Sequence, residues 1–157
     1  MIDQIKTIKE RRALLLDSIR DLNEEQLNKI PPGFNNNIIW NLGHIIAVQQ
    51  WICYKRSGLS PMVTDDFWSK FKPGSKPPAI VSAVEIAEIF VSIVNTIDQL
   101  FISRQNNVFN AYSAWTALTN VEIANIDDAI NFTLFHDVVH AKKILDLKKC
   151  VEHHHMQ

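Results

Sequence analysis

The sequence predicts an all-α domain, a four-helix bundle in which a long crossover joins the second and third helices. Four segments of the 157-residue chain repeat apolar residues with the period of an amphipathic helix. The segments between them are rich in proline, glycine and asparagine, and only one short stretch alternates as a strand does. Four helices with at least one long crossover are a known way to bury such apolar faces.

The first helix is expected over about residues 2–21, and a short capped turn is expected at 23–26. Arg12 falls inside the apolar stripe of this helix, and we expect its guanidinium to extend to the rim of the bundle. The stripe consists of Ile5, Ile8, Leu15, Ile19 and Leu22.

The second helix is expected from about residue 36 to about residue 57, because Gly58 suits the position just after a helix. It is apolar nearly all round, which indicates burial on more than one side. Part of its apolar surface lies well away from the side that carries His44. Such a surface predicts a partner and therefore a homodimer. Its residues are Ile38, Leu42 and Ile46.

The crossover at 59–81 contains several prolines and glycines, and only 65–71 is expected to form a turn or two of helix. A connection of this length is often functional. Its aromatic residues are expected either to cover the site as a lid or to pack over the end of the bundle. They are Phe67, Trp68 and Phe71. The third helix begins with a capping box at 82–85 and continues to about residue 103.

Residues 104–124 are polar and broken, with a short strand or an irregular loop expected around 108–112. The fourth helix is expected over about residues 126–149, with Asn125 as its cap. We assign 1–150 to a single domain. Residues 151–157 form a tail whose adjacent histidines either bind metal adventitiously or are an addition to the native chain, and we exclude them from the site.

Composition restricts the classes of function. The net charge is -1 without a basic block, which gives no support for a nucleic-acid partner. The apolar runs are shorter than a membrane span and the N-terminus lacks the apolar core of a signal peptide, so a cytoplasmic protein without a membrane partner is expected. Two cysteines are too few for a disulfide framework, and Cys53 is predicted on the face opposite His44.

Three histidines outside the tail predict a metal site. His136 and His140 are four residues apart, so both imidazoles leave the same side of the fourth helix. His44 shares its side of the second helix with Trp40 and Trp51. Three imidazoles and an open position are typical of a catalytic metal. We expect zinc or nickel, with iron as the alternative. The competing interpretation is that these are core histidines hydrogen-bonded to neighbours.

The segment from His136 to His140 also resembles the H-E-x-x-H pattern of zinc proteases, with Asp137 in place of the glutamate. Aspartate is one methylene shorter, and no third ligand of the usual kind follows downstream, so a protease is not favoured. We expect that Asp137 does not bind the metal itself. It is expected either to contact one of the metal-binding residues or to face solvent. A role as general base is the minority interpretation.

Over about residues 5–149 the chain resembles the DinB-like superfamily, which includes the YfiT-like proteins and the bacillithiol- and mycothiol-dependent transferases. The matching segments are Pro31, 36–44 (NNIIWNLGH), 58–62 (GLSPM), 72–77 (KPGSKP), 131–136 (NFTLFH) and His140. The resemblance implies a bundle with a long crossover, a metal held by three histidines and frequent dimerisation. The implied ligands are His44, His136 and His140. Some members transfer thiols, others are related to maleylpyruvate isomerase, and many have no known activity. The small residue common two positions after the last ligand is replaced here by Lys142.

The predicted function is metal-dependent transfer of a low-molecular-weight thiol to an electrophilic small molecule. Metal-dependent hydrolysis of a small substrate and a non-enzymatic, stress-associated metal-binding or scaffold role are the alternatives. The pocket is expected between the second and fourth helices, with Trp40, Trp51 and Phe132 as its walls. Lys143 lies within about 60° of the two histidines on its helix and is a candidate either to hold an anionic thiol or to be a solvated lysine.

Overall fold

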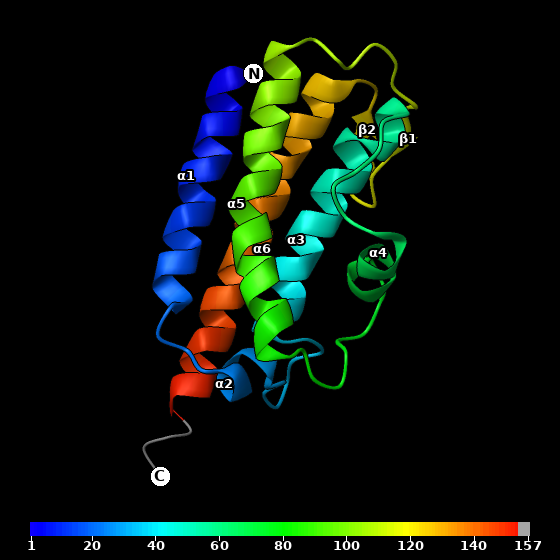
Figure 1. Ribbon diagram of the computed structural model, residues 1–157. Coiled ribbons are helices and arrows are strands. Elements are labelled where there is room, and N and C mark those ends of the chain that lie inside the picture. The colour runs from blue at the N-terminus through cyan, green and yellow to red at the C-terminus, as the bar shows by residue number, and fades with distance from the viewer. Residues whose placement is uncertain (154–157) are drawn as a thin grey trace.

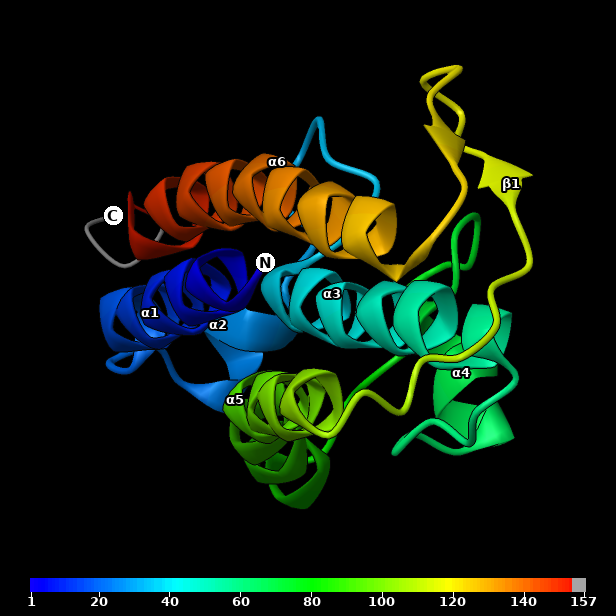
Figure 2. The ribbon, with the colours of Figure 1, turned by 90° about the horizontal axis from the view of Figure 1, so that it is seen from above.

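The computed structural model describes residues 1–153 and confirms the all-α class. Four long helices lie side by side (Figures 1 and 2). They are α1 (Ile2–Ile19), α3 (Ile38–Cys53), α5 (Ala83–Gln105) and α6 (Ile126–His153). Three short helical segments connect them: α2 (Glu24–Asn28), η1 (Lys55–Ser57) and α4 (Asp65–Phe71). Strands β1 (Trp115–Thr116) and β2 (Glu122–Ile123) pair antiparallel and form the only sheet within residues 1–153.

Side-chain caps start α5 and α6 where the sequence predicted them. Ser82 and Glu85 form the reciprocal capping box of α5, and the Asn125 side chain accepts a hydrogen bond from the backbone of Asp128 at 3.0 Å. The residues around 108–112 form a loop, and the strands lie later, at 115–116 and 122–123. Helix α6 continues to His153, while the remainder of the predicted tail, 154–157, lies outside the described residues.

Helix α3 is the central helix of the bundle. It packs against α5, α6 and the crossover helix α4, and every residue of α3 except Trp51 is buried. The expectation that it is buried on more than one side is therefore confirmed. The apolar surface on which we based a homodimer is not exposed, because Ile38, Leu42 and Ile46 pack in one cluster with residues of α1 and α5. That argument for a dimer was wrong, and the dimer stays a prediction without it.

Arg12 of α1 is buried, with 1% of its surface exposed, so the expectation that it reaches the rim was wrong. Its guanidinium donates to both carboxylate oxygens of Asp137 in α6, at 2.7 and 3.3 Å, and to the carbonyl of Ile93 in α5 at 3.0 Å. Because the interior of the bundle provides acceptors for its hydrogen bonds, the charged guanidinium of Arg12 remains buried. Through these hydrogen bonds Arg12 joins three of the long helices, α1, α5 and α6.

The crossover presses α4 against the side of α3 (Figure 1). A Cβ atom at Gly43 would lie 2.4 Å from Cδ1 of Phe71, so only glycine allows this approach. Phe71 is buried, and Phe67 and Trp68 pack against the same core cluster. The aromatic residues of the crossover therefore cover the flank of α3 and not the end of the bundle.

Helix α5 is the one described helix whose length and hydropathy would suit a membrane span. Its buried isoleucines face the interior of the bundle, against α1 and α3. Only this face is buried, and exposed apolar residues elsewhere on the helix, among them Val84, Val91 and Ile102, add to its hydropathy.

Candidate metal centre

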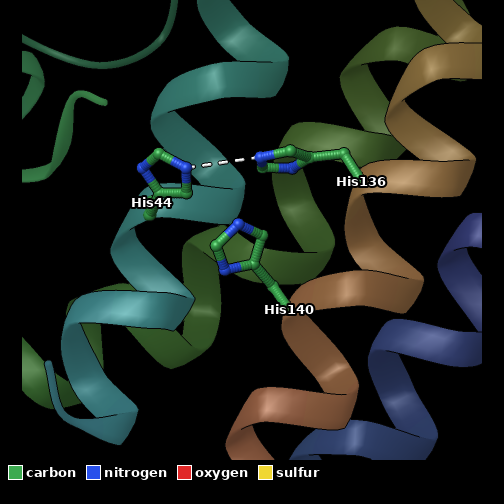
Figure 3. Close-up of side chains that lie close together, drawn as sticks. All are labelled: His44, His136 and His140. Atoms are coloured by element: carbon green, nitrogen blue, oxygen red, sulfur yellow. Dashed lines mark hydrogen bonds between the residues drawn. The ribbon is translucent and has the colours of Figure 1, made fainter. Parts of the chain in front are cut away.

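Three imidazoles from two helices meet in the interior of the bundle (Figure 3). His44 comes from α3, and His136 and His140 come from successive turns of α6. The Nε2 atoms of His44 and His136 are 3.3 Å apart. One ring nitrogen from each of the three residues lies within 4.8 Å of the others. The sequence therefore identified the residues that the fold brings together.

Packing of α3 against α6 creates this arrangement. The spacing of four residues places His136 and His140 on the α6 side that faces α3, with their ring centroids 4.4 Å apart. His44 and His140 are 5% and 6% exposed, and His136 is partly buried. The cluster is therefore largely shielded from water but reachable at His136.

The crossover fixes the orientation of His44. Nδ1 of this ring lies 2.7 Å from the backbone carbonyl oxygen of Phe71, at the end of α4. A carbonyl oxygen can only accept a hydrogen bond, so Nδ1 carries the proton and Nε2 presents its lone pair. The close approach of Phe71 to Gly43 brings that carbonyl within reach.

A side chain of α3 fixes His140 in the same way. Nδ1 of His140 lies 2.8 Å from Oδ1 of Asn41, so this ring also carries its proton on Nδ1 and leaves Nε2 free. Sequence reasoning missed Asn41 and the Phe71 carbonyl. Asn41 did give a signal, since it is a polar residue one turn before His44 on a helix that is otherwise almost wholly apolar.

Burial keeps the three rings neutral. Desolvation, followed by repulsion from the neighbouring rings, lowers the pKa of His136 to about 2. Desolvation likewise lowers the pKa of His140 to about 3 and lowers the pKa of His44. Neutral imidazole is the form that binds a metal, so no proton has to be removed from a charged ring near neutral pH.

The donor set fits a divalent ion with nitrogen ligands. Two nitrogens bound to one tetrahedral zinc at about 2.0–2.1 Å are roughly 3.3–3.4 Å apart. The separation of the His44 and His136 Nε2 atoms, 3.3 Å, matches this value. Three protein ligands leave a fourth position for water or a substrate, as catalytic zinc sites do.

Aromatic rings surround the histidines. Trp40 stacks on His44 with ring centroids 4.7 Å apart, and Phe132 stacks on His136 at 5.8 Å. Trp115 meets the edge of Phe132 at 5.6 Å, and Trp51 meets Trp115 at 5.7 Å. We call Phe132, Trp115 and Trp51 the aromatic wall. Of the predicted pocket residues, Trp40 and Phe132 contact the histidines, whereas Trp51 lies at the far end of this wall.

The two candidate catalytic side chains lie differently. Both oxygens of Asp137 are hydrogen-bonded to Arg12, and burial raises the pKa of this carboxyl while the guanidinium opposes that rise. Lys143 is exposed, and its positive charge contributes to the lowered pKa of all three histidines, so it lies near the cluster.

Cys53 does not have the properties of a nucleophile. Its thiol is buried, and desolvation raises its pKa to about 12. The thiolate is the reactive form of cysteine, and very little of it exists at such a pKa.

The family model of the DinB superfamily matches residues 7–144. This range contains all three histidines, the crossover and most of the four long helices. No curated protein matches the chain.

Proposed function

Because this chain belongs to the DinB superfamily and brings three neutral imidazoles together, we propose that it is a metal-dependent enzyme that transfers a low-molecular-weight thiol to an electrophilic small molecule. The observation that carries the proposal is the set of three ring nitrogens within 4.8 Å of one another. His44, His136 and His140 would hold the ion, with zinc or nickel favoured and iron as the alternative.

When bound, a divalent ion held by three neutral ligands would lower the pKa of a thiol or water at its open position. Phe71 and Asn41 hold two of the imidazoles with Nε2 directed inward. In the proposed transfer the thiol sulfur bonds to the electrophilic carbon while the bond from that carbon to its leaving group breaks. The leaving group departs with the electron pair of that bond, and the proton of the thiol passes to solvent. We assign no proton transfer to Asp137, because Arg12 occupies both of its oxygens.

The substrate is proposed to bind against the aromatic wall. Phe132 contacts His136 and also lines a cavity of about 330 Å³ next to β2. A cavity of this size suits a small molecule. Apolar side chains dominate its lining and include Val121, Ile123 and Phe135. This supports an apolar electrophile, while Lys143 would attract an anionic group on the thiol.

Metal-dependent hydrolysis is the second candidate, because the same open position holds water as readily as a thiol. A purely structural metal is the third. The two enzymatic candidates differ in whether a thiol binds at the histidines. A cytoplasmic location is part of the first proposal, since the cytosol keeps small thiols reduced.

A thermal-shift screen of the metal-loaded protein tests the proposal. The thiols are bacillithiol, mycothiol, glutathione, coenzyme A and cysteine, each with its S-methyl derivative as the matched control. A thiol at about 100 times its dissociation constant should stabilise the protein by about 2.7 kcal/mol. Stabilisation by a thiol but not by its S-methyl form, lost in His136→Ala, supports binding through the sulfur. No shift with any thiol removes the transferase proposal and favours hydrolysis or a structural metal.

A further inference from the structure

Both the nitrogen and the oxygen of the Asn41 side-chain amide have hydrogen-bond partners. The residue is 0% exposed and lies on α3 between the helix cap and His44. Its side-chain nitrogen donates to the backbone carbonyl of Asn37 at 2.7 Å and to Oδ1 of Asn36 at 2.9 Å. Its oxygen faces Nδ1 of His140 at 2.8 Å.

These contacts allow only one orientation of the carboxamide. The two hydrogens of the amide nitrogen are both used by oxygen acceptors, so the remaining oxygen must face His140. A flipped amide would place its oxygen against the carbonyl of Asn37 and its nitrogen against His140. The carbonyl of Asn37 therefore excludes the flipped amide, and Oδ1 of Asn36 accepts the second hydrogen of the observed orientation.

Asn41 orients the ring without adding charge. Partners outside the ligand shell are often carboxylates, which raise the basicity of the imidazole. Here the partner of His140 is a neutral amide, and the partner of His44 is a neutral carbonyl. The acidic residue closest in sequence, Asp137, points to Arg12 instead. The positive charge of a bound ion would therefore be little compensated by these partners.

We propose that Asn41 is a positioning residue of the metal centre, and that the Asn36–Asn41–His140 relay holds His140 in the tautomer that binds metal. The inference rests on the proposed metal centre for its function. The tautomer itself is a property of the metal-free protein and can be measured separately.

Three variants test the relay. Asn41→Leu keeps a similar volume but removes the acceptor, Asn36→Leu removes only the anchor, and Asn36→Asp restores an acceptor at that position. Two quantities are measured for each: the His140 tautomer of the metal-free protein by long-range ¹⁵N–¹H NMR, and the zinc dissociation constant by chelator competition.

Metal-free wild-type protein should show the proton of His140 on Nδ1. Asn41→Leu should give a mixture of tautomers and bind zinc about 10–100 times more weakly. Asn36→Leu should change the His140 tautomer and the zinc dissociation constant in the same direction as Asn41→Leu, but by a smaller amount. Asn36→Asp should resemble the wild type in both. If Asn41→Leu fails to fold, the two Asn36 variants still decide the matter.

A wild-type zinc affinity in folded Asn41→Leu would overturn the proposal. So would a metal-free wild type with the proton of His140 on Nε2. Failure of the metal centre itself looks different. In that case wild-type protein binds no zinc at the histidines, while the Nδ1 tautomer of His140 still depends on Asn41 and Asn36.

Discussion

The Nε2 atoms of His44 and His136 face each other at 3.3 Å. His44 carries its proton on Nδ1, which donates to the carbonyl of Phe71, so its Nε2 has a lone pair. A second lone pair at this distance would repel it. A proton or a cation between the two atoms makes the contact favourable. The same pair of atoms thus suits a hydrogen bond in the metal-free protein and two ligands in the loaded one.

The first prediction concerns the proton of His136. In metal-free protein it is expected on Nε2, where it donates to His44. Metal binding at Nε2 must move it to Nδ1 or release it. Long-range ¹⁵N–¹H NMR with and without zinc measures this change. A metal-free His136 with its proton on Nδ1 would contradict the assignment of His44.

The second prediction is a loss of stability in acid. The pKa of His136 is lowered to about 2 and that of His140 to about 3, whereas an unfolded histidine titrates near 6.5. Between those values the unfolded chain binds more protons than the folded one. The free energy of unfolding should therefore fall as the pH falls below about 6.5, by up to about 1.4 kcal/mol per pH unit for each such histidine.

Urea unfolding of metal-free protein between about pH 5 and about pH 7 measures this slope. His136→Gln provides the control, because it removes one of the titrating groups without removing the helix. The slope of this variant should be smaller by roughly one proton. An unchanged slope would show that His136 does not remain neutral in the fold.

The third prediction concerns the contact of Gly43 with Phe71. Gly43→Ala would place a methyl group 2.4 Å from Cδ1 of Phe71 and force α4 away from α3. Overpacking of this kind costs about 1–3 kcal/mol, against a gain of up to about 1 kcal/mol from replacing glycine within a helix. We expect a net loss of stability. We also expect weaker zinc binding, because the carbonyl that orients His44 moves with Phe71.

Phe71→Leu supplies the comparison for that variant. It trims the ring that Gly43 contacts but keeps the backbone carbonyl, so its zinc affinity should stay within a few-fold of wild type. In the double variant the leucine should relieve part of the clash. Equal zinc affinities in Gly43→Ala and wild type would argue against a role of the crossover in orienting His44.

The fourth prediction concerns the buried ion pair of Arg12 and Asp137. Removing one partner leaves an uncompensated charge in the interior, so Arg12→Met or Asp137→Leu should each cost about 3–5 kcal/mol. Replacing both with apolar residues, Arg12→Met with Asp137→Leu, should cost much less than the sum. Urea unfolding of these variants gives the coupling energy. Additive losses would show that the pair contributes no such coupling.

Local signals predicted the helices because they depend on neighbours in sequence. The capping box of Ser82 and Glu85 starts α5 where expected, and the spacing of His136 and His140 placed both rings on one side of α6. The meeting of these rings with His44 followed from the expectation that polar ligands in a bundle face its interior. The fold and the three histidines were therefore predictable from the sequence.

Long-range partners were not predictable, because no local pattern records them. Arg12 is buried only because Asp137 and the Ile93 carbonyl lie opposite it on other helices. Every residue has a backbone carbonyl, so the sequence does not mark that of Phe71 as the acceptor for His44. Only the packing of α4 against α3 brings the two together. The burial of α3 on more than one side was expected from its apolar residues, but its packing against α5 and the crossover was not.

The central claim is that His44, His136 and His140 bind one divalent metal ion. Metal content and X-ray absorption of protein with His153, His154 and His155 replaced by alanine measure this without interference from the tail. We expect about one ion per chain with three histidine nitrogens at about 2.0–2.1 Å if the metal is zinc. His44→Ala and His136→Ala should each abolish stoichiometric binding while the helices remain folded. Less than about a tenth of an equivalent after growth in supplemented medium, or binding that survives both substitutions, would contradict it.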